Sequence, residues 1–304
     1  MATVAQQPCV ARSNTKAADF WALTKPEINF LIAIATFAGF YMGLPTERHG
    51  FPLVLLIHTL LGTLMVSSGA GVLNQYAERR FDAQMRRTRR RPLADDRVDP
   101  VSALWFGILL SFGGGIYLAV AVNPLASLLA LFTLASYLDL YTPLKRKTPL
   151  CTLVGAVSGA MPPLIGWAAA SGKLSFEAIV LWAILFLWQF PHFMAIAWMY
   201  RDDYARAGYL VLPQGEQSGR FMSWQALVPS LALIPISLSP AVFGHAGIVY
   251  FVVAFALSSG YFIMSARLAF RRSNLAARRL LMASIVYLPL AFILIMVVKN
   301  LRAA

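Results

Sequence analysis

Nine long apolar runs constrain the fold of this chain more than any other feature of its sequence. Each run is about as long as the 17 to 25 residues that a helix needs to cross the hydrocarbon core of a bilayer. The sequence therefore predicts an all-α integral membrane protein with nine transmembrane helices. The runs are Ile28–Leu44, Pro52–Leu73, Ser102–Val122, Leu125–Tyr141, Leu150–Ala170, Phe176–Tyr200, Trp224–Phe243, Ala246–Ala266 and Leu280–Val298.

The composition excludes an ordinary soluble domain, because only 13% of the residues are charged and the mean hydropathy is +0.64. A soluble domain has about a quarter of its residues charged. Cys9 and Cys151 lie far apart, so neither a disulfide framework nor a cysteine-based metal site is indicated. Residues 1–25 are polar and carry no convincing cleavable signal. We predict a cytoplasmic N-terminal segment, 1–25, and one polytopic membrane domain, 26–304.

The lysines and arginines fall mainly on one side of the predicted membrane. If the N-terminus is cytoplasmic, 22 of the 26 basic residues lie in cytoplasmic segments and four lie outside. This bias predicts a cytoplasmic N-terminus and an odd number of crossings. It also explains the net charge of +13 without nucleic acid, because the basic face meets anionic lipid and, we expect, an anionic substrate.

The densest cluster of charge is Asn74–Leu93, which reads NQYAERRFDAQMRRTRRRPL. Asn74, Glu78 and Asp82 are spaced four residues apart, so on a helix they share one face. Three oxygen ligands on one face are typical of Mg²⁺, which binds one or two carboxylates together with substrate phosphates. Charges at the end of a membrane helix are costly and usually functional. These three residues are therefore the predicted metal ligands.

Basic residues near this motif allow two interpretations. The arginines after Asp82 match phosphate geometry, but arginine runs on the cytoplasmic side of membrane helices are also common topology signals. Topology alone accounts for most of them as a group. Lys25 precedes Pro26 at the start of the first run, where it is either an interface anchor or part of a phosphate site.

The middle of the chain indicates an internal pocket. The fifth run contains Pro162 and Pro163, and a helix broken within the membrane is tolerated only where it packs in protein or lines a cavity. The sixth run contains His192, which is a packing histidine, a proton-transfer group or a ligand to a substrate metal. It ends at Asp202 and Asp203, which are either a second acidic site facing the first or a plain hydrophilic loop.

These motifs resemble the UbiA superfamily of intramembrane prenyltransferases and, within it, the branch that farnesylates haem. The first motif has that branch's steps of four and the tail D-x-x-M-x-R-T-x-x-R-P-L from Asp82 to Leu93. Further agreement comes from TKPE at 24–27, YTPLKRKTP through GAMPPLIGW at 141–167, and QFPHF with RDDYARAGYLVLP at 189–213. The resemblance covers most of the chain.

The resemblance implies a UbiA-type bundle with a central cavity open towards the cytoplasm and the lipid. It implies Mg²⁺ as cofactor, farnesyl diphosphate and haem B as substrates, and haem O and pyrophosphate as products. Contacts with haem-A-synthesis or oxidase-assembly proteins are also expected. The implied catalytic residues are Asn74, Glu78, Asp82, Asp202 and Asp203, of which the first three bind Mg²⁺. The implied diphosphate contacts are Arg87, Arg91, Lys145, Arg201 and Lys25, and the implied haem contacts are His192, Tyr137 and Tyr141.

Two departures from the superfamily pattern concern the second acidic site and the mouth of the cavity. The two aspartates of the usual D-x-x-x-D motif fall on Tyr200 and Tyr204, and Glu27 stands where the haem branch often has arginine. The alternatives are a prenyltransferase with another aromatic or tetrapyrrole acceptor, or a non-catalytic carrier of haem or a lipid phosphate. The expected location is a bacterial inner membrane, or the mitochondrial inner membrane in a eukaryote.

Overall fold

The computed structural model describes residues 15–45, 50–213, 219–244 and 246–303, and within them every regular element is helical. Residues 1–14 of the predicted N-terminal segment, including Cys9 and Arg12, lie outside these ranges. The helices are α1 (Lys16–Leu23), α2 (Pro26–Gly43), α3 (Leu53–Asp82), α4 (Pro100–Ala121), α5 (Pro124–Ala135), η1 (Ser136–Tyr141), α6 (Thr142–Leu144), α7 (Cys151–Gly159), α8 (Pro162–Ser171), α9 (Phe176–Met199), α10 (Arg201–Arg206), α11 (Arg220–Val242), α12 (Ile248–Arg271) and α13 (Asn274–Ala303).

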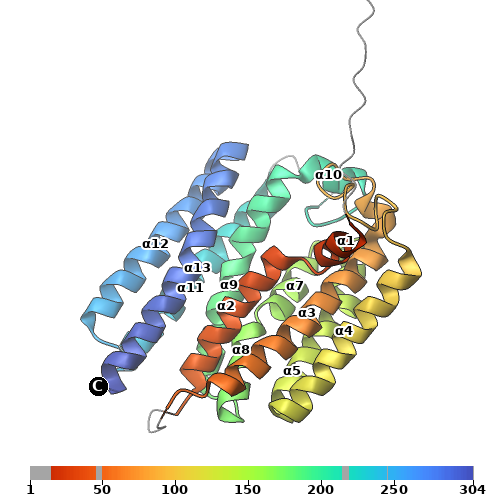
Figure 1. The fold of residues 1–304 in the computed structure, drawn as a ribbon. Helices are drawn as coiled ribbons and strands as arrows, with labels where there is room; N and C mark the ends of the chain where they lie inside the picture. Colours follow the sequence, from red (N-terminus) through yellow and green to blue (C-terminus); the bar gives the residue numbers. More distant parts are fainter. Residues whose placement is uncertain (1–14, 46–49, 214–218, 245, 304) are drawn as a thin grey trace, which may run out of the picture.

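Nine stretches among the described residues are long and apolar enough to cross a membrane, as the sequence predicts. They are Pro26–Gly43, Leu53–Asp82, Pro100–Ala121, Pro124–Leu144, Cys151–Ser171, Phe176–Met199, Arg220–Val242, Ile248–Arg271 and Asn274–Lys299. The described chain begins near one end of the bundle and its C-terminus lies at the other, as an odd number of crossings requires (Figure 1). The all-α membrane fold is confirmed.

The outer surface of the bundle is apolar, which is the surface that lipid requires. Val120 is 84% exposed, Phe270 is 80% exposed and Val249 is 73% exposed. Many buried polar side chains instead lie between helices and have a partner in protein, as Ser127 does by donating to the Gly115 carbonyl at 2.7 Å. This inverted pattern is that of an integral membrane protein, because polar groups within a bilayer must be satisfied internally.

Small residues set the closest helix contacts. A Cβ on Gly39 of α2 would lie 2.0 Å from the Pro163 carbonyl oxygen of α8, and a Cβ on Gly166 would lie 2.0 Å from the Thr36 carbonyl oxygen. Such backbone approach is typical of membrane helices, whose association depends on packing rather than on the hydrophobic effect. Helices α2 and α8 therefore meet backbone to backbone.

Two interruptions of regular helix lie beside the interior of the bundle. The fifth span is broken between α7 and α8, at Ala160 and Met161, as the Pro162–Pro163 pair predicts. The fourth span changes to a π-helical turn at η1, and such turns are frequent at functional sites. Both interruptions line one cavity of about 500 Å³. The predicted internal pocket is confirmed.

Candidate active site

The acidic face of α3 forms the polar end of this cavity. Asn74, Glu78 and Asp82 all line it, although their side chains are almost completely withdrawn from solvent, with residue exposures of 1%, 5% and 1%. They share one face because α3 continues as regular helix to Asp82, well beyond the predicted apolar run. Buried carboxylates require a cation or a set of donors to hold them.

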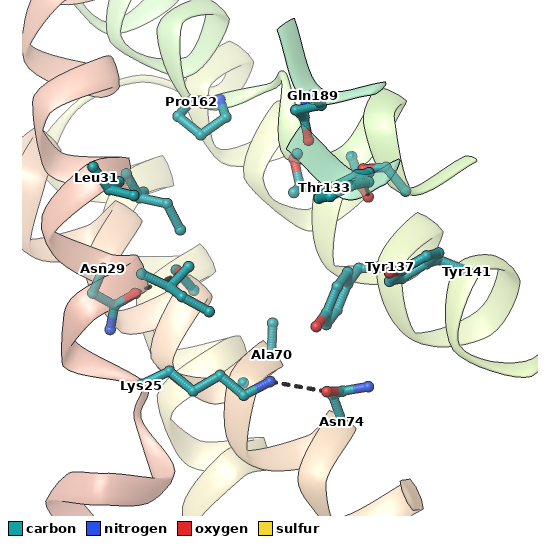
Figure 2. A pocket seen from close by; sticks show the side chains of 18 of the residues that line it. Lys25, Asn29, Leu31, Ala70, Asn74, Thr133, Tyr137, Tyr141, Pro162 and Gln189 are labelled. Carbon is teal, nitrogen blue, oxygen red and sulfur yellow. Dashed lines mark hydrogen bonds between the residues drawn. The ribbon is translucent and has the colours of Figure 1, made fainter. Parts of the chain in front are cut away.

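Each of the three acidic-face residues is paired with a different basic side chain. Lys25 Nζ donates to Asn74 Oδ1 at 2.9 Å (Figure 2), and Lys145 Nζ donates to both carboxylate oxygens of Glu78 at 3.0 and 3.1 Å. Arg91 Nη1 donates to Asp82 Oδ2 at 2.7 Å. The basic residues come from three separate segments of the chain, so the tertiary fold assembles this set of pairs.

Lys25 is held in place by an unusual backbone conformation. It is the N-cap of α2 and has a φ of 56° and a ψ of 62°, the left-handed region that L-residues with a Cβ rarely adopt. This strain costs about 1–3 kcal/mol and persists only where the surrounding structure imposes it. Burial lowers the pKa of Lys25, and the neighbouring Arg91 and Lys145 charges act in the same direction.

Lys145 follows the fourth span, and its pKa shifts in the opposite direction to that of Lys25. Burial alone would lower the pKa of its ammonium, but the oxygens of Tyr141 and Glu78 outweigh burial and raise the pKa above its usual value. Lys145 Nζ also lies 4.5 Å from the centre of the Tyr141 ring. The ammonium is therefore a fixed positive charge at the polar end of the cavity.

Some residues of the arginine-rich loop after α3 line the cavity, and others do not. Met85 and Thr88 are buried and anchor the loop, and the Thr88 hydroxyl donates to the Asp82 carbonyl at 2.9 Å. Arg87 and Arg91 line the cavity, and Arg87 also lies over the Tyr200 ring, 5.4 Å from its centre. The other arginines of this motif do not line the cavity, as expected for residues that set topology.

The second acidic cluster does not reach the cavity. Arg201 is on the surface of α10, with its guanidinium near Asp202, whose side chain is 86% exposed. Asp203 is buried, but it pairs with Arg206 at 3.1 Å instead of lining the cavity. The structure thus does not bring Arg201, Asp202 or Asp203 to the predicted metal and diphosphate site.

Two tyrosines from the same region line the cavity instead. Tyr204 lies on α10, and Tyr209 packs against Phe81 of α3 with ring centres 6.1 Å apart. Burial raises the pKa of Tyr209, and the Glu78 carboxylate adds to the rise, so this phenol keeps its proton. No periodic pattern in the sequence singles out Tyr209, because its position depends on the Leu210 N–H donating to the Lys145 carbonyl at 2.6 Å.

The remainder of the cavity is lined by apolar and aromatic side chains with few polar groups. Tyr137 and Tyr141 lie on η1 with ring centres 5.4 Å apart, and Gln189 lies at the other end from Lys25 and Asn74 (Figure 2). His192 is also in the wall. The cavity thus joins a charged end to a long apolar chamber, which suits an amphipathic substrate with an anionic head.

The residues present fit a divalent cation at the acidic face. No group of three or more His, Cys, Asp or Glu side chains with metal-site spacing occurs within the described residues, so Asn74 is needed as the third ligand. Asp82 Oδ1 is fully buried and has no hydrogen-bond partner. An amide oxygen and two carboxylates, one of them with an unpartnered oxygen, suit Mg²⁺, which favours oxygen ligands.

Comparisons with known proteins identify the family to which this chain belongs. Residues 32–295 match the UbiA prenyltransferase family. The chain belongs to this family. A protoheme IX farnesyltransferase from Solibacter usitatus is 46% identical over 280 residues, covering 90% of this chain and 96% of the relative. One from Koribacter versatilis is 40% identical, covering 99% of this chain and all of the relative.

Solved structures share the fold at low sequence identity. Digeranylgeranylglyceryl phosphate synthase superposes with a TM-score of 0.73 at 15% identity, covering 93% of this chain and 98% of its own. A UbiA homologue from Archaeoglobus fulgidus bound to DMAPP and Mg²⁺ has a TM-score of 0.66 at 16% identity, covering 91% and 99%. The UbiA-type bundle with its central cavity is thereby established for this chain.

Proposed function

We propose that this protein transfers the farnesyl group of farnesyl diphosphate to a vinyl group of haem B. Water is added in the same conversion, and the products are haem O, used in terminal oxidase assembly, and pyrophosphate. The observation that supports this proposal most is the cavity itself. At one end of its apolar chamber lie three oxygen-bearing side chains, each paired with a basic residue. The names of the two bacterial relatives support haem as the acceptor.

The basic side chains at the charged end bind the diphosphate in this proposal. Lys25, Lys145 and Arg91 already lie at the acidic face, and Arg87 lines the same cavity. Charge-assisted hydrogen bonds from such groups to phosphate oxygens are among the stronger polar contacts in proteins. They orient the diphosphate so that the bond to the first farnesyl carbon points into the apolar chamber.

Asn74, Glu78 and Asp82 would hold Mg²⁺ at the same end. When bound, Mg²⁺ would supply Lewis-acid stabilisation of the negative charge on the departing pyrophosphate. The homologue from Archaeoglobus fulgidus, solved with DMAPP and Mg²⁺, supports this part of the proposal. We leave Asp202, Asp203 and Arg201 out of the site because none of them lines the cavity.

The apolar part of the cavity holds the farnesyl chain and keeps water away from the reacting carbon. Leu31, Ile32, Val66 and Leu134 line it and offer no nucleophile to an allylic cation. The haem vinyl group is then the nucleophile that captures the cation, and water adds afterwards. Haem is placed against His192, Tyr137 and Tyr141 in this arrangement.

The protein functions in a membrane with its charged end towards the basic, N-terminal side. We infer that this side is cytoplasmic, since most lysines and arginines lie there. A bacterial inner membrane fits the bacterial origin of the relatives. Haem-A-synthesis or oxidase-assembly proteins, which would receive the product, are the expected protein partners.

The test is a conversion assay with purified protein in detergent. Haem B, farnesyl diphosphate and Mg²⁺ are supplied, and haem products are identified by mass spectrometry. A farnesylated and hydrated haem that forms with Mg²⁺ and disappears with a chelator is the expected result. Release of pyrophosphate only with another aromatic or tetrapyrrole acceptor would overturn the haem assignment, and no turnover with any acceptor would indicate a carrier.

A further inference from the structure

The two ring nitrogens of His192 have different surroundings. Nδ1 lies 2.8 Å from the Ser284 hydroxyl oxygen of α13. Nε2 has no hydrogen-bond partner among the described residues, and it is not one of the fully buried unpartnered atoms. Because His192 lines the cavity, Nε2 is the nitrogen that the cavity reaches.

The Ser284 contacts determine which nitrogen carries the proton. Its hydroxyl oxygen also lies 2.6 Å from the Leu281 carbonyl oxygen, a distance that requires a proton between the two oxygens. Ser284 has a single hydroxyl proton, which this bond uses, so its oxygen can only accept from His192. The proton of a neutral His192 is therefore on Nδ1, and Nε2 carries the lone pair.

The same turn of α13 also fixes the plane of the imidazole. The Trp188 ring stacks on it with centres 4.8 Å apart and planes 26° apart. Trp188 Nε1 in turn donates to the Ser284 carbonyl at 2.9 Å. Two side chains of α9, Trp188 and His192, are thus tied to one residue of α13, and the imidazole cannot rotate freely.

We propose that Nε2 of His192 is an axial ligand of the haem iron, and that Ser284 is the residue that positions it. This inference rests on the proposed function, because it takes haem to be the acceptor. A neutral imidazole with a free lone pair is a common ligand of haem iron. Histidines that bind metals usually donate their other N–H to an oxygen, which sets the tautomer and raises ligand basicity. The His192–Ser284–Leu281 chain has that arrangement.

Ligation would give the reaction its orientation. A porphyrin anchored through its iron cannot slide along an apolar chamber, so its distance from the charged end is fixed, and the walls of the chamber limit its rotation about the iron–nitrogen bond. The diphosphate is fixed independently by the basic side chains around Asn74 and Glu78. Two anchors of different chemistry, one for each substrate, place the reacting carbons next to each other, and such positioning is a large part of catalysis.

The experiment is a titration of purified protein with ferric haem B, followed by absorption and electron paramagnetic resonance spectroscopy. The wild type is expected to show a histidine-ligated spectrum. His192→Gln keeps the side-chain volume and the donor to Ser284 but should lose that spectrum, and His192→Ala should regain it when imidazole is added. His58→Ala is the matched control, because His58 contacts Tyr117 at 2.6 Å and does not line the cavity.

Ser284→Ala tests the positioning role separately. It should keep histidine ligation but lower the iron–histidine stretching frequency of the reduced protein and weaken haem binding about tenfold. Haem bound with an unchanged spectrum in His192→Gln would overturn the ligation and leave the proposed function intact. Failure of the wild type to bind haem would overturn the proposed function as well. An unchanged stretching frequency in Ser284→Ala would overturn the role of Ser284.

Discussion

Arg91 binds only one of the two carboxylate oxygens of Asp82. Arg91 Nη1 donates to Oδ2 at 2.7 Å, while Oδ1 is fully buried and has no partner. Leaving a buried acceptor unsatisfied costs about 1–3 kcal/mol. This cost is understandable if Oδ1 is the oxygen that meets the metal, with Arg91 holding the other oxygen so that the carboxylate cannot turn away.

Asp82→Asn should therefore abolish activity without unfolding the protein. The amide can keep an acceptor for Arg91, but it replaces the charge that would bind Mg²⁺. We expect the rate of pyrophosphate release to fall by at least about 100-fold, the size of loss seen when one electrostatic contact to a transition state is removed. Asp95→Asn is the control, because Asp95 pairs with Arg97 outside the cavity. Wild-type activity in Asp82→Asn would exclude Asp82 from the metal site.

Mg²⁺ and diphosphate should stabilise the protein together and not separately. Lys25, Lys145 and Arg91 hold the oxygens that a metal would need, so Mg²⁺ alone must displace positive charges from the acceptors they now have. A diphosphate gives these side chains new acceptors. We expect little change in thermal stability with Mg²⁺ alone. With Mg²⁺ and a farnesyl diphosphate analogue at a hundredfold excess over Kd, we expect a gain of about 2.7 kcal/mol. An equal gain from Mg²⁺ alone would contradict this view.

The membrane fold could be predicted from the sequence because its main signals are local. A run of about twenty apolar residues defines a span without knowledge of its neighbours, and the Pro162–Pro163 pair marks the break between α7 and α8. The ends of the spans were less predictable. The last span begins at Asn274 instead of Leu280, since charged residues near its start, such as Arg278, continue the helix beyond the apolar run.

The site could be predicted only where its residues share a helix. The register of Asn74, Glu78 and Asp82 is a property of α3 alone, and their arrival at one cavity follows from it. The pairing of Lys25 with Asn74 depends on a strained backbone at a distant point of the chain. Tyr209 lines the cavity and Asp203 does not, because a loop folds back over the cavity. No periodic pattern in the sequence encodes that fold.

The Glu78–Lys145 pair should contribute to stability and to activity in different ways. Glu78 is buried and the Lys145 side chain is only 14% exposed, so Lys145→Met would leave the Glu78 carboxylate without its cation, at a cost of about 3–5 kcal/mol. The double variant Glu78→Gln with Lys145→Met removes both charges and should recover most of that stability. It should not recover activity, because the proposed function assigns Glu78 to the metal and Lys145 to the diphosphate. Thermal unfolding in detergent and pyrophosphate release measure the two effects. Additive losses of stability would show that the pair is not coupled.

Gly39→Ala should disrupt the contact that closes one side of the cavity. The new Cβ would lie 2.0 Å from the Pro163 carbonyl oxygen, and since that atom belongs to the backbone, α2 and α8 would have to move apart. Overpacking of this kind costs about 1–3 kcal/mol and occasionally more. Gly260→Ala on α12 is the matched control, because its Cβ meets no atom within 4 Å and alanine favours the helix.

The two glycine variants differ in activity as well as in stability. Pro162 and Ile165 of α8 line the cavity, so displacement of α8 should reduce turnover in Gly39→Ala by more than the loss of folded protein explains. The measurement is the thermal midpoint in detergent, with activity normalised to folded protein. Gly260→Ala should retain both values. Equal midpoints for the two variants would mean that α2 and α8 do not meet backbone to backbone, and the shape of the cavity would then need another explanation.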